Sequence, residues 1–88
     1  MPSYLVEVYL PRSRAHDASV SARRVRAAAE SLSREGEPIR HVRTTFLPDD
    51  ETCFHVLEAG SAEVVEAAVG RAGLGRARVV RAVETSPP

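Results

Sequence analysis

The chain contains no lysine and no tryptophan, and it has one cysteine, Cys53, among 88 residues. Without lysine, neither a lysine Schiff base nor a lysine general base is available. A single cysteine excludes an internal disulfide framework and any CxxC redox or zinc motif. A chain without disulfides suits a reducing compartment, so we expect a cytoplasmic protein.

Long apolar runs and an excess of charge are also missing. No run approaches the ~20 residues of a membrane span, and 12 basic residues, all arginine, balance 12 acidic ones. The N-terminus enters a strand pattern at once, so we expect no signal peptide and no membrane partner. Zero net charge, without a basic-glycine-aromatic signature, argues against a nucleic-acid partner. GxGxxG, Walker and GxSxG patterns are absent, so no organic cofactor is indicated.

Apolar periodicity and turn residues predict six elements. A helix begins at Asp17 or Ser19, either of which can cap it, and Gly36 and Pro38 stop it. Ser61 caps a second helix, and Gly73 ends it in a left-handed conformation with Leu74 folding back on Val69. The predicted strands cover residues 4–10, 39–47, 52–58 and 76–84. We expect one domain over residues 1–88, ordered from about 4 to 84, with a frayed tail at 85–88.

The order strand-helix-strand-strand-helix-strand predicts the fold class. Right-handed crossovers in both halves give the split β-α-β arrangement, which is the ferredoxin-like α+β fold. Its four-stranded antiparallel sheet carries both helices on one face. The other face, here called the open face, must be solvated, hold a ligand or meet a second subunit. We expect a homodimer of the α+β-barrel type.

The turn at residues 48–51 predicts which side chains share the open face. If Leu47 lies opposite Thr52, then His41 lies across from Glu58 and Arg43 from Val56. The side chains that point to the opposite face of these two strands are more apolar, so we expect them under the helices. They are Val42, Thr44, Phe46, Cys53, His55 and Leu57. A slip of one residue would exchange His41 for His55.

Glu7 and Tyr9 are expected to join His41, Arg43 and Glu58 on the open face, because burying them would be costly. Glu7, His41 and Glu58 form a plausible nitrogen and oxygen ligand set for a borderline divalent metal such as nickel or zinc. Tyr9 and Arg43 are candidates for contacting a small ligand. The plain alternative is a solvated face whose ion pairs contribute little.

The other reactive side chains have simpler interpretations. His55 is expected to be a hydrogen-bonded, half-buried histidine, His16 an exposed one, and Cys53 a small core residue rather than a nucleophile. Three arginines of the first helix, at 23, 24 and 26, are interpreted as a solvated basic shoulder.

Four segments together resemble a known family. They are Tyr4-Leu5-Val6-Glu7, Ile39-Arg40-His41-Val42-Arg43-Thr44 before an acidic turn, Cys53-Phe54-His55-Val56-Leu57-Glu58-Ala59, and Ala72-Gly73-Leu74. Their order and spacing are similar to a small bacterial domain family of unknown function, common in actinobacteria and labelled nickel-binding or nickel-responsive. The resemblance covers about residues 4–84. It implies a ferredoxin-like homodimer that binds metal, and Glu7 is the residue it transfers most directly.

Three functions remain open from the sequence. The first is a non-enzymatic homodimer that binds a metal through Glu7, His41 and Glu58, or a small ligand. The second is a small dimeric α+β-barrel enzyme, such as a cofactor-free oxygenase, isomerase or cyclase, with Tyr9, His41 and Glu58 as acid-base groups. The third is a dimerisation module without a ligand.

Overall fold

Four strands and two helices follow one another in the predicted order in the computed structural model, which describes residues 1–88. The elements are β1 (Ser3–Tyr9), the short helix η1 (Arg12–Arg14), α1 (Asp17–Arg34), β2 (Ile39–Leu47), β3 (Thr52–Ala59), α2 (Ala62–Ala72) and β4 (Arg78–Ala82). The strands form one antiparallel sheet in the order β2-β3-β1-β4. The ferredoxin-like α+β prediction is therefore confirmed.

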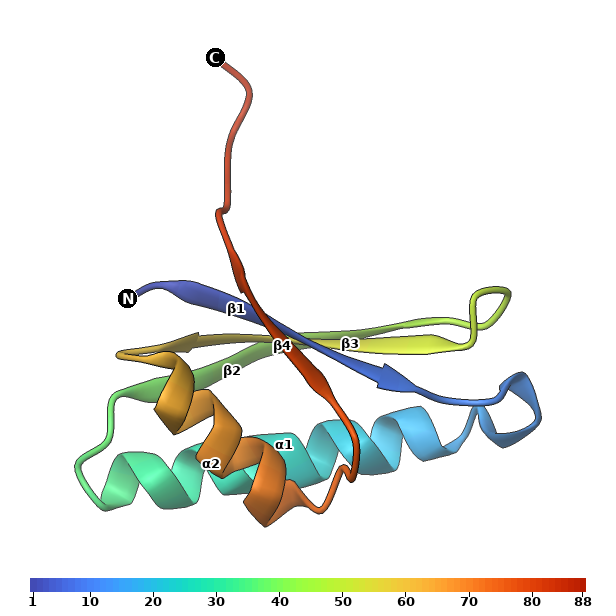
Figure 1. The fold of residues 1–88 in the computed structure, drawn as a ribbon, viewed down its shortest axis with the longest axis horizontal. Helices are drawn as coiled ribbons and strands as arrows, with labels where there is room; N and C mark the ends of the chain where they lie inside the picture. Colours follow the sequence, from blue (N-terminus) through green and yellow to red (C-terminus); the bar gives the residue numbers. More distant parts are fainter.

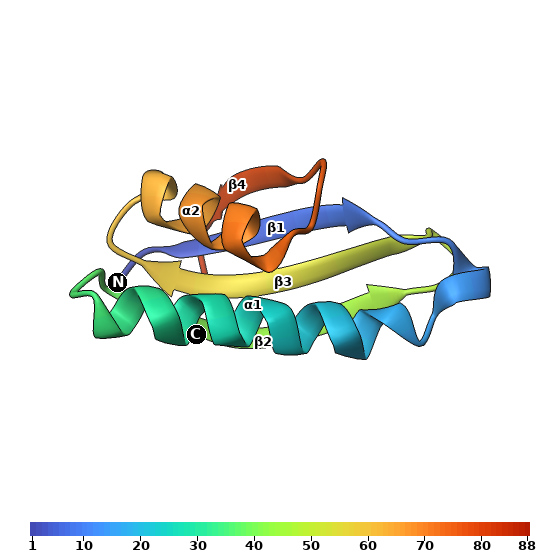
Figure 2. The same ribbon diagram turned by 90° about the horizontal axis from the view of Figure 1, so that it is seen from below.

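The two helices form one layer and the sheet forms the other. Figure 1 shows α1 and α2 on the same side of the sheet, with α1 packed along β2 and against α2. In Figure 2, α1 runs along the β2 side of the sheet while α2 lies near β1 and β4. The tail after β4 leaves on the side away from the helices (Figure 1). Neither helix combines the length and apolar character that a membrane crossing would need.

The core lies between the two layers because each helix presents one apolar stripe to the sheet. α1 contributes Val25 and Leu32, and α2 contributes Val65, all nearly inaccessible to solvent. Val6 and Leu57 meet them from the central strands β1 and β3. Alanines at 28, 29, 68 and 72 fill the remaining buried helix positions of the core.

The two helices begin differently. Ser61 caps α2 as predicted, since its Oγ accepts a hydrogen bond from the Val64 N–H at 3.4 Å. The predicted side-chain cap of α1 is wrong, because the helix begins at Asp17 with no side-chain cap and Asp17 accepts instead from Arg14 Nε at 2.8 Å. A backbone hydrogen bond lies at this end of the helix, from the Ala18 N–H to the carbonyl of Ala15, the residue after η1.

The end of α2 follows the sequence prediction. Gly73 has φ of 67°, in the left-handed region, and the Leu74 N–H donates to the Val69 carbonyl at 3.4 Å. Gly70 lies within α2, and an added Cβ would meet no atom within 4 Å at either glycine. The backbone conformation alone therefore distinguishes the two sites.

Replacing these glycines with alanine should change stability in opposite directions. Gly70→Ala should raise the free energy of unfolding by about 0.5–1 kcal/mol, because alanine favours a helix interior. Gly73→Ala should lower it by about 1 kcal/mol, because a Cβ is disfavoured at positive φ. Urea unfolding measures both, and a stabilising Gly73→Ala would contradict the left-handed ending.

Candidate functional site

The β2–β3 hairpin follows the expected register only in the half next to its turn. Leu47 pairs with Thr52, and the pairing runs without interruption to Arg43 opposite Val56. A β-bulge then intervenes between His41 and Arg43, with Val42 as the extra residue. Beyond it, His41 pairs with Leu57 and Arg40 pairs with Glu58.

The bulge corrects the predicted location of His41. One extra residue moves the following side chains to the opposite face of the pleat, so His41 lies on the helix-covered side with its partner Leu57. Arg40 takes the expected place of His41 beside Glu58 on the open face. Val42, also predicted to face the helices, is the unpaired residue of the bulge.

The remaining open-face residues form a regular grid. Its rows, read across β2, β3, β1 and β4, are Arg40, Glu58, Ser3 and Ala82; Arg43, Val56, Leu5 and Val80; and Thr45, Phe54, Glu7 and Arg78. The middle row is apolar except for its arginine. A charged pair of neighbouring residues lies on either side of it.

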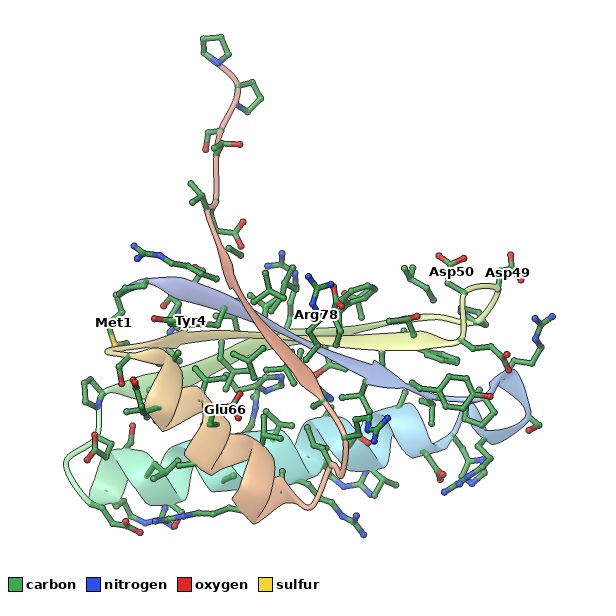
Figure 3. All side chains as sticks on the ribbon, in the orientation of Figure 1. Met1, Tyr4, Asp49, Asp50, Glu66 and Arg78 are labelled. Carbon is green, nitrogen blue, oxygen red and sulfur yellow. The ribbon has the colours of Figure 1, made fainter.

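These two ion pairs occupy equivalent places in the two β-α-β halves. Glu7 lies two residues after Leu5, and Glu58 lies two residues after Val56, the partner of Leu5. Arg40 Nη2 lies 2.7 Å from Glu58 Oε1, and Arg78 Nη1 lies 3.4 Å from Glu7 Oε2. Figure 3 shows Arg78 on the side of the sheet away from the helices.

The expected metal ligands are not brought together. Glu7 and Glu58 do share the open face, but Glu58 pairs across from Ser3, so roughly 13 Å of strand separates the carboxylates. His41 lies on the opposite side of the sheet. No three His, Cys, Asp or Glu side chains in residues 1–88 are grouped so as to hold a metal ion.

The expected ligand-binding residues are also apart. Arg43 lies at the β2 end of the middle row and has no ion-pair partner within 4 Å. Tyr9 lies at the end of β1, with 69% of its surface exposed. It borders an open groove of about 600 Å³ together with Val8, Leu74 and Arg76. Tyr9, His41 and Glu58 therefore do not form the acid-base set considered for an enzyme.

A continuous chain of polar contacts lies on the helix side of the sheet, and the sequence did not predict it. Arg26 Nε of α1 donates to His41 Nδ1 at 3.3 Å. His41 Nε2 lies 2.9 Å from Thr44 Oγ1, which lies 2.7 Å from His55 Nδ1. His55 Nε2 faces Cys53 Sγ at 3.9 Å. We call this set of five residues the histidine relay.

The arginine at one end fixes the direction of every hydrogen bond in the relay. A guanidinium can only donate, so His41 Nδ1 must be the unprotonated acceptor and His41 Nε2 must carry the hydrogen. Thr44 therefore accepts from His41 and donates its own hydroxyl hydrogen to His55 Nδ1. His55 Nε2–H then points towards the sulfur of Cys53, and both imidazoles are neutral.

Burial accounts for the titration behaviour of the relay. His55 has no exposed surface, and burial lowers its pKa to about 4, with a smaller contribution from His41. Burial also lowers the pKa of His41, and the charge of Arg26 lowers it further. Burial raises the pKa of the Cys53 thiol, which is 1% exposed. Cys53 is thus a core residue, as predicted, and His55 is hydrogen-bonded but buried more deeply than expected.

The one sequence signal for the bulge, and so for the histidine relay, was a conflict in the alternation of buried and exposed residues along β2. Ile39 and Arg43 are four residues apart and would share a face in a regular strand. One is a core residue and the other is exposed, so the pleat has to change phase between them.

No protein-family model, curated protein or solved structure matches the chain. Its function therefore has to be inferred from its own side chains.

The buried His55 should make stability fall in acid. The unfolded chain protonates this residue near pKa 6.5, whereas the folded chain does so only near 4. The unfolded state therefore binds more protons between these values, and stability is lost as the pH falls through them. From about pH 7.5 to about pH 5, His55 alone should lower the free energy of unfolding by about 2 kcal/mol.

Urea unfolding at both pH values tests this with two variants. His55→Asn keeps an acceptor for Thr44 but cannot titrate, so its loss in acid should be smaller by about 2 kcal/mol. His16→Gln changes an exposed histidine and should lose as much as the parent protein. An unchanged acid loss in His55→Asn would show that His55 is not the group responsible.

Proposed function

We propose that the protein is a non-enzymatic, ligand-binding homodimer whose two subunits pack through their open faces. The observation that carries this proposal is the apolar row of Val56, Leu5 and Val80 across three strands on the side without helices. A sheet that is apolar on both faces needs a layer on each. Within one chain, a helix layer covers only one of the two faces of the sheet.

A second copy is the occupant favoured by three features. The apolar row is flanked by the two equivalent Arg–Glu pairs, so each side of the row presents both a positive and a negative group to a second copy. Arg43, at the end of the row, has no carboxylate partner of its own. The tail leaves on the open-face side, and its Val83 is 80% exposed. In a face-to-face dimer this tail would lie against the other subunit.

The groove beside Tyr9 favours a small amphipathic carboxylate as the ligand. β4 pairs with β1 only as far as Glu7, so Val8 and Tyr9 extend past β4 and leave a groove next to them. Val8, Leu74 and Ala77 give it apolar walls. Arg76 has no ion-pair partner, while Arg78 is already paired with Glu7. Apolar walls with one free guanidinium suit an apolar body with a carboxylate head.

The same side chains argue against catalysis. The two imidazoles of the relay are engaged with their neighbours, and the thiol of Cys53 is buried. Glu7 and Glu58 are each paired with an arginine. A nucleophile activated by a base at an accessible cavity, which acid-base or covalent catalysis needs, is not present in this arrangement.

Sedimentation tests the dimer with a charge placed in the apolar row. Leu5→Lys should shift the dimer–monomer equilibrium towards monomer by about 100-fold or more, because a lysine would be desolvated without a partner. The control Ala67→Lys adds the same charge on the exposed surface of α2 and should remain dimeric. A parent protein that sediments as a monomer even at about 0.1 mM would refute the proposed dimer.

Chemical-shift titration with benzoate tests the ligand groove. Benzoate should shift the resonances of Val8 and Leu74, and benzyl alcohol, which lacks the charge, should bind more weakly. Arg76→Gln should weaken benzoate binding by about tenfold through loss of a charge-assisted contact. Arg81→Gln removes a charge from β4 outside the groove and should have little effect. Equal affinities in the two variants would rule out this groove as the site.

A further inference from the structure

A second, larger groove lies along the β2 edge of the sheet. It has a volume of about 840 Å³ and runs between α1 and β2. Arg26, Glu30 and Arg34 line it from α1, while Arg40 and His41 line it from β2. Because β2 is an edge strand, one side of its backbone has no strand partner there.

The charges along this groove are unbalanced. Arg40 is paired with Glu58, so it contributes little uncompensated charge. Arg26 and Arg34 have no carboxylate within 4.0 Å, and Glu30, the one acidic residue of the lining, makes no ion pair. The lining therefore contains two guanidiniums and one carboxylate that form no ion pair, and the groove has a net positive charge.

Arg26 has a weak partner in this state. Its one hydrogen bond goes from Nε to the neutral His41 Nδ1 at 3.3 Å, which is long for a charged donor. Its terminal nitrogens make no hydrogen bond to the protein. An oxyanion accepts from a guanidinium more strongly than an imidazole does, often through two parallel bonds. Such an anion is therefore a stronger acceptor for Arg26 than His41 Nδ1 is.

We propose that the α1–β2 groove binds a small oxyanion, a carboxylate, phosphate or sulfate group, on Arg26, and that Arg26 leaves His41 when the anion binds. Arg34 lies two helical turns further along α1 and adds attraction without contacting His41. Glu30 lies between the two arginines in the sequence and opposes the anion.

Release of Arg26 couples anion binding to a proton. His41 Nδ1 loses its donor and becomes free to take up a hydrogen, while His41 Nε2–H keeps its bond to Thr44. The ionisable groups around this imidazole are Arg26, Glu30 and Arg34 on α1, Arg40 on β2, and His55 and Cys53 on β3. Of these, Arg26 is the one whose charge lowers the pKa of His41, and burial lowers it further.

The sign of the coupling follows from that contact. When Arg26 turns to the anion, one cause of the low His41 pKa is removed, so the bound state takes up a proton more readily. By linkage, a lower pH must then favour the bound anion. The affinity should therefore rise as the pH falls from neutral to mildly acidic values.

Sulfate is the probe that separates this coupling from titration of the ligand, because its charge is constant across the range. Titration followed by NMR of the His41 ring, at constant ionic strength, should show saturable binding that is about fivefold or more tighter near pH 5.5 than near pH 7.5. Acetate, compared with sulfate near pH 7.5, distinguishes a carboxylate site from a site for larger oxyanions.

Three variants sharpen the test. Arg26→Gln should weaken sulfate binding by about tenfold or more and raise the His41 pKa even without sulfate. Arg23→Gln removes the same charge from α1 outside the groove and should leave both unchanged. Glu30→Gln should tighten binding. The proposal is overturned if sulfate does not saturate, if Arg26→Gln and Arg23→Gln bind alike, or if the affinity is independent of pH.

Discussion

The alternation of side chains along β2 decides what lies on each side of the sheet, and one extra residue resets it. Between the hairpin turn and the bulge at Val42, residues 43–47 keep the alternation set by the turn. On the far side of the bulge, residues 39–41 lie on the faces opposite to those that an uninterrupted strand would give them. The bulge puts Ile39 into the core and His41 beneath α1, and it puts Arg40 next to Glu58. Without it, Arg40 would point into the helix layer, and His41 would lie on the open face across from Glu58.

The elements and the topology could be predicted because the signals for them are local. Gly73 and Ser61 mark the ends of α2 through backbone conformation and capping, which depend only on neighbouring residues. The turn fixed the hairpin register as far as Arg43 for the same reason. The bulge could not be predicted from the turn, because it depends on the burial of Ile39, which is four residues from Arg43. The mismatch between Ile39 and Arg43 was visible in the sequence, but only knowledge of the covered face gives it meaning.

The candidate site shows the limit of this reasoning. Glu7 and Glu58 were correctly assigned to the open face, yet distance along the strand and pairing with arginines separate them into two independent pairs. The histidine relay was missed because its members come from three elements, and Arg26, although exposed as predicted, also donates to His41. Its direction follows from one donor-only group at its end, a constraint that residue types in a strand cannot reveal.

The low pKa of the relay histidines has a consequence for the electrostatic repulsion between molecules in solution. All 12 basic residues are arginine, and they balance 12 acidic residues. Of the three histidines, only His16 is outside the relay and exposed. The relay histidines therefore add no charge near pH 7, where the formal charge of the chain is zero. Long-range repulsion between molecules is then weak at this pH, and short-range surface complementarity governs whether copies associate.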